Sequence, residues 1–96
     1  MLTKEEILKR LREHKTELQR KFPLKSLALF GSYARNEQTD TSDIDVLVEF
    51  SEPVGFEFID LIEELERLFN HKIDLVSKKG VKSHYLPYIE DDAIYV

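Results

Sequence analysis

The sequence predicts an α/β (α+β) domain in which a small mixed β-sheet is covered by helices. Three short apolar segments, each bounded by proline, glycine or polar turn residues, have the character of strands. Two longer segments repeat their apolar residues at helical spacing, which predicts helices that pack one face on the sheet. A chain of 96 residues suffices for one hydrophobic core. We therefore expect a single domain over residues 1–96.

The first long helix is expected to begin at Thr3 and to end before Pro23. Thr3 and Glu6 have the spacing of a capping box, and proline cannot continue a helix. Its predicted buried face consists of Ile7, Leu11, Leu18 and Phe22. The second long helix is expected over Phe56–Phe69, with Asn70 as its C-terminal stop. Its predicted buried residues are Phe56, Phe58, Ile59, Ile62, Leu65 and Phe69.

The three predicted strands span Leu24–Phe30, Asp43–Phe50 and Lys72–Val76. The first is a short apolar run between a proline and a glycine, and the second alternates polar with apolar residues at period two. The tail is more ambiguous because Pro87 interrupts it. We expect Tyr88–Ala93 to form one or two helical turns before the terminal residues.

Composition restricts the classes of function. Hydrophobic residues make up 42% of the chain and charged residues 34%, and the absence of cysteine removes disulfide and thiolate metal sites from consideration. No apolar run approaches the ~20 residues needed to span a bilayer, and the first residues lack the pattern of a signal peptide, so we expect a cytoplasmic protein with no membrane partner. The net charge of −5 disfavours direct nucleic-acid binding. It does not disfavour a nucleotide, because carboxylates that bind Mg²⁺ present a cation to phosphates.

Gly31 and Ser32 follow the first predicted strand and open a short helix. Glycine allows close approach of a ligand or a positive φ, and a helix N-terminus offers free N–H groups to a phosphate. The Ser32 hydroxyl could add another donor. A Gly-Ser pair after a strand is also common as a plain turn with a helix cap, so the pair gains meaning only from its neighbours.

Asp43 and Asp45 lie two residues apart on the second predicted strand, so their side chains point to the same face about 7 Å apart at the Cα atoms. Asp74 is expected on the strand Lys72–Val76, on the face opposite to its buried residues. If this strand lies beside the second one, Asp74 joins the other two aspartates. Three carboxylates around two cations about 3.5–4 Å apart match the two-metal arrangement for displacement at phosphorus. Each aspartate taken alone is equally compatible with an exposed position on a strand.

In this order the strand, the Gly-Ser turn, the Asp-x-Asp strand, the helix and the Asp-bearing strand resemble the polymerase-β-type nucleotidyltransferase superfamily. The segments Gly31–Glu37 and Ser42–Phe50 are similar to those of its minimal nucleotidyltransferase (MNT) branch. The resemblance covers nearly the whole chain, since Lys72–Val76 and Ile89–Val96 also fit. Asn36 departs from the family pattern, which usually has glycine there, but asparagine tolerates the left-handed conformation better than most residues.

The resemblance implies the polymerase-β-like fold and a role for each motif residue. Gly31 and Ser32 would bind the triphosphate. Asp43 and Asp45 would ligate Mg²⁺, two ions being expected. Asp74 would complete the metal site or help to deprotonate the attacking hydroxyl. The implied reaction is transfer of AMP from ATP, or of NMP from another NTP, onto a hydroxyl group.

Other polar and aromatic residues have less specific interpretations. Arg35 could neutralise phosphate charge, and a structural salt bridge with Glu37 or Asp40 is equally compatible with its position. Glu49 shares the face of Asp43 and Asp45 but lies further along the strand, at the rim. Surface or packing roles are expected for His14, His71 and His84, and core or interface positions for Tyr85, Tyr88 and Tyr95.

The resemblance also implies a partner. Small proteins of this type often pair with HEPN-domain proteins, helical RNases, in toxin–antitoxin modules, where the nucleotidyltransferase is the antitoxin and can place AMP on a tyrosine of the toxin. Two rival hypotheses remain: a non-catalytic module that neutralises its partner by contact, and nucleotidyl transfer to a small molecule. The chain length argues against the second rival, since little room is left for a domain that would hold a small substrate.

Overall fold

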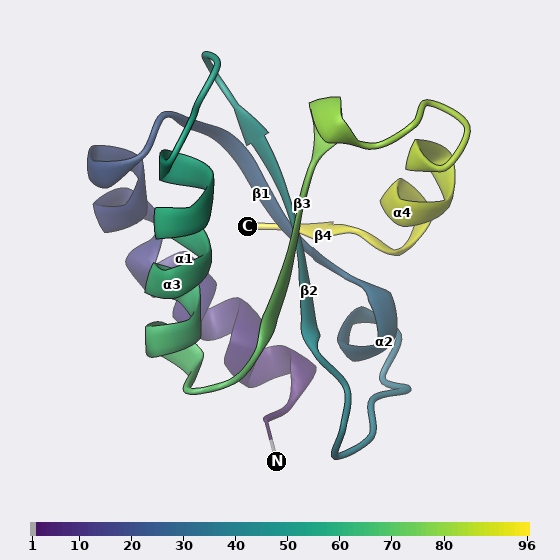
Figure 1. Cartoon of the computed structure of the whole chain (residues 1–96). Helices are drawn as coiled ribbons and strands as arrows, with labels where there is room; N and C mark the ends of the chain where they lie inside the picture. Colours follow the sequence, from purple (N-terminus) through teal and green to yellow (C-terminus); the bar gives the residue numbers. More distant parts are fainter. Residues whose placement is uncertain (1) are drawn as a thin grey trace.

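The computed structural model describes residues 2–96 and contains one four-stranded mixed sheet with the strand order β3-β2-β1-β4. Two long helices cover one side of the sheet, and two short helices lie on the other side (Figure 1). The bounds of the elements are α1 Lys4–Lys21, β1 Leu24–Phe30, α2 Gly31–Ala34, β2 Ile44–Phe50, α3 Glu57–Phe69, β3 Ile73–Ser77, the 3₁₀ turn η1 Lys78–Gly80, α4 Leu86–Asp92 and β4 Ile94–Tyr95. The predicted fold class is confirmed.

The sheet combines two kinds of pairing. β1 pairs antiparallel with β2 and with β4, whereas β2 pairs in parallel with β3 through the crossover helix α3. The parallel register places Asp45 of β2 opposite Asp74 of β3. The antiparallel register places Phe30, the last residue of β1, opposite Asp45 as well. The start of β2 therefore lies between the end of β1 and the first half of β3.

The hydrophobic core lies between the sheet and the pair α1 and α3. It contains apolar side chains from both helices and from all three longer strands, among them Ile7, Leu11, Leu18, Leu29, Ile44, Val46, Leu61, Leu65 and Leu75. No charged residue is buried in the described part of the chain. Burial of a large aliphatic side chain stabilises the fold by about 1.5–3 kcal/mol, so this one-sided core carries most of the stability.

The predicted start of the first helix is confirmed. Thr3 caps α1, and its side chain accepts a hydrogen bond of 3.2 Å from the backbone N–H of Glu6. All four residues of the predicted buried face are buried. β1 has its predicted bounds, while β2 and β3 each begin one residue later than predicted, so Asp43 and Lys72 lie just before their strands.

The buried stripe of the second helix was predicted in part wrongly. Phe56 is 85% exposed and Ile59 is 51% exposed, whereas Leu61, which was not predicted, is completely buried. The face that meets the sheet is centred on Leu61 and Leu65, since residues three, four and seven apart share one helix face. The predicted stop is confirmed, because Asn70 adopts the left-handed conformation with φ 48°.

The tail differs from its prediction at Pro87. This proline lies in the first turn of α4, where a missing N–H costs no helical hydrogen bond, so it starts the helix and does not interrupt the segment. The chain then returns as the short edge strand β4 beside β1. Within residues 2–96 no helix is long and apolar enough to cross a bilayer.

Candidate nucleotide and metal site

Gly31 ends β1 and begins α2 with a φ of +76°, a conformation that residues with a side chain rarely adopt. The carboxylate of Asp45 packs directly on this glycine. A Cβ atom at position 31 would lie 2.8 Å from Cγ of Asp45 and closer still to Oδ2. The turn therefore requires glycine for two reasons, its backbone conformation and the space that the carboxylate occupies. Ser32 follows in the first turn of α2.

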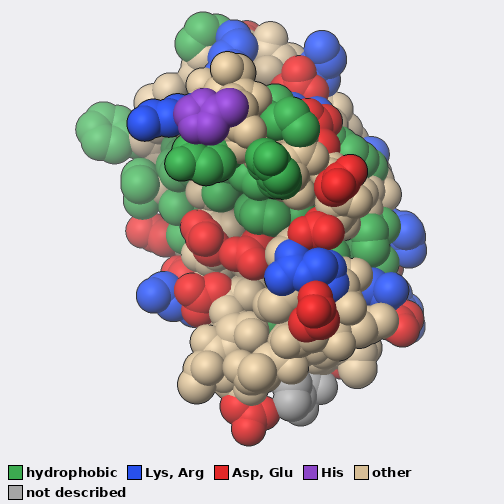
Figure 2. All heavy atoms as spheres, turned by 90° about the vertical axis from the view of Figure 1, so that its right-hand side faces the viewer, with side chains coloured by type: hydrophobic (Ala, Val, Ile, Leu, Met, Phe, Trp, Pro, Cys, Tyr) green, Lys and Arg blue, Asp and Glu red, His purple; other side chains and the backbone are tan. Residues whose placement is uncertain are grey.

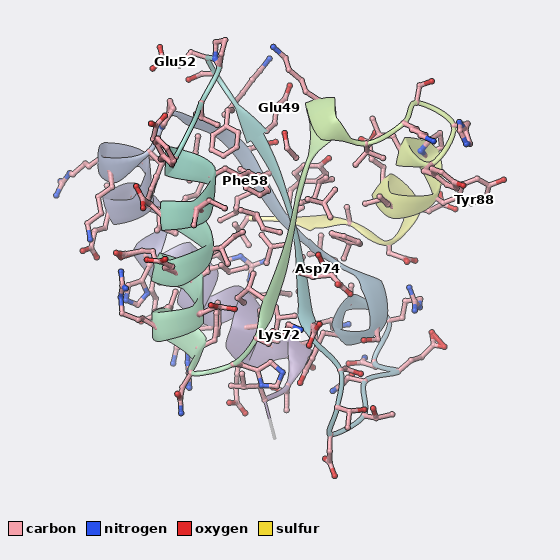
Figure 3. All side chains as sticks on the ribbon, viewed as in Figure 1. Glu49, Glu52, Phe58, Lys72, Asp74 and Tyr88 are labelled. Carbon is pink, nitrogen blue, oxygen red and sulfur yellow. The ribbon has the colours of Figure 1, made fainter. Side chains whose placement is uncertain are left out.

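Asp45 and Asp74 are neighbours across the parallel pairing of β2 and β3. Figure 3 shows Asp74 on the side of β3 that faces α2. The pKa of Asp45 is raised to about 6, first by its partial burial, then by the charge and hydrogen bonding of Asp74 and by the charge of Asp43, against a smaller opposing effect of Arg35. Two carboxylates this close repel when both are ionised, and a bound cation would relieve that repulsion.

Asp43 lies one residue before β2 and is partly exposed, whereas Asp74 is exposed. The Asp43 side chain is 39% exposed, and its Oδ2 is 4.0 Å from Nζ of Lys72. Lys72 itself is largely exposed and lies just before β3, so the two loops that enter the parallel strand pair meet at this ion pair. Asp43, Asp45 and Asp74 are thus gathered at one edge of the sheet, as the sequence predicted on the condition that the two strands are neighbours.

Carboxylate oxygens are the ligands that Mg²⁺ prefers, and we expect a cation at these three residues only if water and a substrate phosphate complete its coordination. Among residues 2–96, no group of three or more His, Asp or Glu side chains stands in an arrangement that would hold a metal ion by itself. Mg²⁺ does not need three protein ligands, since it is usually bound by one or two carboxylates, several waters and substrate phosphates. The pairing of Asp45 with Asp74 on adjacent strands favours such a cation here, and the raised pKa of Asp45 agrees with it.

Arg35 lies at the C-terminal end of α2 and holds two carboxylates. Its Nε donates to Oε1 of Glu37 and its Nη1 donates to Oδ2 of Asp92, both at 2.6 Å. The pair with Glu37 was among the predicted alternatives, but the second partner is Asp92 of α4 and not Asp40. These hydrogen bonds raise the pKa of Arg35 and fix its guanidinium near Asp45, whose pKa it lowers. Asn36, which follows, has the predicted left-handed conformation with φ 58°.

Tyr33 and His71 pack against each other and against the segment that leads into Asp43. The sequence did not single them out for this role. Tyr33 is 1% exposed, and its ring meets that of His71 edge-on at 6.0 Å between centroids. His71 in turn lies 2.7 Å from the carbonyl oxygen of Ser42, the residue before Asp43. Burial raises the pKa of Tyr33, with a smaller contribution from the charge of Asp40. The expected packing role of His71 is consistent with these contacts.

The remaining candidate residues lie away from the carboxylates. Glu49 forms ion pairs with Lys25 at 3.7 Å and Lys78 at 3.6 Å, which suits the predicted rim position. His14 contacts the backbone oxygen of its own helix, at Arg10. The three tyrosines of the tail are not core residues, since Tyr85, Tyr88 and Tyr95 are 55%, 76% and 42% exposed.

Comparisons of the sequence with known proteins agree on one family. The family model described as "Nucleotidyltransferase domain" matches residues 11–96. A protein of Methanocaldococcus jannaschii named "Putative protein adenylyltransferase" is 50% identical over 100 residues, and the match covers the full length of both chains. The protein adenylyltransferase MntA of Thermococcus cleftensis is 42% identical over 97 residues, with 100% of this chain and 98% of that protein covered.

Solved structures share the fold. One described as a "putative minimal nucleotidyltransferase" has a TM-score of 0.82 and 30% identity, over 97% of this chain and 95% of that chain. Another contains a tri-AMPylated Shewanella oneidensis HEPN toxin in complex with an MNT antitoxin; its TM-score is 0.61 at 20% identity, over 96% of this chain and 66% of that chain. At that identity the second likeness concerns the fold alone.

Proposed function

This chain belongs to the nucleotidyltransferase-domain family, and we propose that it is the antitoxin of a toxin–antitoxin module that transfers AMP from ATP to a tyrosine hydroxyl of a HEPN-domain toxin. The observation that carries the proposal is the position of Asp45, which lies opposite Asp74 on the neighbouring strand and packs on Gly31. It combines a place for phosphates with a place for the cation that accompanies them. The two full-length relatives described above are both named as adenylyltransferases of proteins, which supports a protein acceptor.

The phosphates would lie at the Gly31-Ser32 turn, where glycine allows close approach of the backbone and where α2 begins with N–H groups that have no helical partner. Arg35, oriented by Glu37 and Asp92, contributes positive charge close to Asp45. Asp43, Asp45 and Asp74 would hold Mg²⁺, with two ions expected. When bound, the metal neutralises phosphate charge and orients the oxygens for in-line displacement.

The reaction exchanges one phosphoester bond for another. The tyrosine oxygen forms a bond to the α-phosphorus of ATP, the bond to the pyrophosphate oxygen breaks, and pyrophosphate leaves. The phenolic proton must be taken up, and Asp74 is the carboxylate proposed to assist, since it is exposed on the side from which an acceptor would arrive. Positioning and charge neutralisation supply most of the rate enhancement in such a transfer.

A HEPN toxin is proposed as the acceptor for two reasons. The sequence resembles the MNT proteins that pair with such toxins, and a solved structure with this fold contains an AMPylated HEPN toxin bound to an MNT antitoxin. An ATP-consuming module of this kind would act in the cytoplasm. We expect the toxin to present its tyrosine at the end of the sheet where Asp43, Asp45 and Asp74 lie.

The double variant Asp43→Ala/Asp45→Ala tests the proposal. Wild-type protein with ATP and Mg²⁺ should add one or more AMP groups to the co-purified toxin, and the variant should reduce the rate by at least a hundredfold. Intact-mass spectrometry of the toxin measures the addition, and Asp60→Asn, an exposed change on α3, serves as the control. A toxin that gains no AMP from the wild type, or gains it equally from the double variant, would contradict the enzymatic proposal.

The same variant separates the rival in which the protein neutralises the toxin by contact. Such a module would protect growing cells as well after the loss of both aspartates as before it. An enzyme would lose protection together with AMP transfer. Growth of cells that express the toxin with each antitoxin variant therefore decides between the two.

A further inference from the structure

Helix α4 contributes no buried residue to the molecule. Leu86 and Ile89 are only half-buried, while Tyr85 is 55% and Tyr88 76% exposed. In Figure 2 hydrophobic side chains gather on this face of the molecule, above a band of acidic side chains. Figure 3 shows Tyr88 pointing outward from the helix, away from the sheet. We call Tyr85, Leu86, Tyr88 and Ile89 the α4 patch.

A helix of seven residues gains little from its own hydrogen bonds, and helices in proteins depend on burial of an apolar face. Because the α4 patch is largely exposed, α4 obtains little of the stabilisation that burial of an apolar face would provide. Contiguous exposed apolar surface with a polar rim is typical of sites where another protein binds. Tyrosine is also enriched among the residues that dominate binding energy at such interfaces.

The α4 patch lies on the same side of the sheet as the proposed site at Asp45 and Asp74. α4 lies on the side of the sheet that carries α2, opposite α1 and α3 (Figure 1). The 2.6 Å ion pair between Arg35 and Asp92 connects the end of α4 to the end of α2, next to Asp45. A protein seated on the α4 patch would therefore reach the carboxylates with an adjoining part of its own surface.

The charges around the patch indicate the chemistry of its partner. Three consecutive acidic residues, Glu90, Asp91 and Asp92, occupy the C-terminal turn of α4, where the helix dipole disfavours negative charge and where no basic residue is present. Arg35 neutralises Asp92, and Lys78 lies 3.9 Å from Glu90. Asp91 is exposed and has no ion pair within residues 2–96. A lysine or arginine of a partner would complete this turn.

We propose that the α4 patch is the docking surface for the acceptor protein, a helical partner with an exposed apolar face flanked by lysine or arginine side chains. Docking there brings the acceptor tyrosine of that partner to Asp45 and Asp74. The proposal rests on protein adenylyl transfer as the function, and it adds where the acceptor is held and by which contacts.

The test compares Tyr85→Ser/Tyr88→Ser with a matched control. Phe56→Ser removes an aromatic side chain that is even more exposed, at the start of α3 on the other side of the sheet. The dissociation constant of each full-length chain for the purified HEPN toxin of its module is measured without ATP. Binding of a non-hydrolysable ATP analogue with Mg²⁺ is measured in parallel, and Asp91→Lys is included as a charge-reversal variant.

The double variant should bind the toxin at least tenfold more weakly, with affinity for the ATP analogue unchanged within twofold, while Phe56→Ser changes neither value. Asp91→Lys should weaken toxin binding and make it less sensitive to salt, because an attraction between opposite charges is lost. If the double variant also loses the ATP analogue, its fold is compromised and Asp91→Lys alone decides.

Unchanged toxin affinity of the double variant, or an equal loss with Phe56→Ser, would overturn the docking surface. So would a wild type that binds no toxin, or a patch whose loss only dissolves a homodimer in sedimentation experiments. A wild type that binds the toxin through the α4 patch but transfers no AMP would leave the docking surface standing and refute the adenylyl transfer.

Discussion

Gly31 and Asp45 fit each other so closely that neither can change independently. The glycine has a positive φ, and the carboxylate occupies the volume that a side chain at position 31 would need. Because the same carboxylate is a proposed metal ligand, the phosphate-binding turn and the metal site are joined at van der Waals distance. A displacement of either one is transmitted directly to the other.

Gly31→Ala should therefore impair both stability and catalysis. We expect a loss of about 1–3 kcal/mol in the free energy of unfolding from the left-handed conformation and the clash with Asp45, and a loss of most AMP transfer. Urea denaturation and the transfer assay measure the two effects. Gly55→Ala is the matched control, since a Cβ there would meet nothing within 4 Å; equal effects of the two variants would contradict the explanation.

Asp45 also imposes an electrostatic cost on the free protein. The pKa of Asp45 is about 6 in the folded protein, whereas the ordinary pKa of an aspartate is 3.8. Between these pH values the folded chain keeps a proton that the unfolded chain has released, so stability falls as pH rises through this window and stays lower above it. The difference of about two pKa units corresponds to roughly 3 kcal/mol at most.

Asp45→Asn should consequently be more stable than the wild type at pH 8 without metal, by about 1–3 kcal/mol, while the difference should shrink at pH 4. Thermal denaturation at both pH values measures this. Mg²⁺ with an ATP analogue should stabilise the wild type and not the variant. Asp43→Asn should have a smaller effect, because the Asp43 side chain is 39% exposed and has Nζ of Lys72 at 4.0 Å. A variant that is less stable at both pH values would refute the electrostatic cost.

Among the elements, α2 and α4 form one unit through Arg35. The guanidinium donates a hydrogen bond from Nε to Glu37, just beyond α2, and another from Nη1 to Asp92 at the end of α4. Both partners are partly exposed, so the pair contributes only about 0.2–1 kcal/mol to stability. We propose that its larger effect is to hold Arg35 in one orientation beside the proposed phosphate position.

Asp92→Asn should thus separate orientation from stability. We expect the KM for ATP to rise about three- to tenfold, since the charge of Arg35 remains but its direction is less defined, while the free energy of unfolding changes by less than about 1 kcal/mol. Steady-state AMP transfer at varied ATP concentration gives KM and kcat separately. Asp60→Asn is the control on α3. A normal KM for ATP would assign Arg35 a purely structural role.

The second helix illustrates how far periodicity can predict an element. Its existence and its stop at Asn70 were predicted correctly, because an apolar repeat over three turns and a residue that tolerates positive φ are local signals. Its buried face was shifted: Ile59 is half-exposed and Leu61 is buried. Apolar residues occur on more than one side of this helix, so only contact with the sheet determines which of them are covered.

At the scale of the whole molecule, one face of the sheet is covered by the long helices and the other carries the proposed site. α1 and α3 cover the first face, which carries most of the hydrophobic core, whereas the short helices α2 and α4 lie on the second, where we propose that the nucleotide, the metal and the acceptor bind (Figure 1). The parallel pairing of β2 with β3, reached through α3, is what brings Asp74 beside Asp45. Residues from two strands that are far apart in the sequence therefore meet at one end of the sheet.

The sequence by itself determined the elements and the motif residues, namely the Gly31-Ser32 turn and the carboxylates of Asp43, Asp45 and Asp74, because turn chemistry and side-chain alternation are local properties of the chain. Only the tertiary structure decided three matters. It made Asp74 the neighbour of Asp45, it gave Arg35 the partner Asp92, and it left the tyrosines of α4 uncovered. The physical reason is that strand order, long-range ion pairs and burial depend on which elements meet in space, and no local pattern encodes that choice.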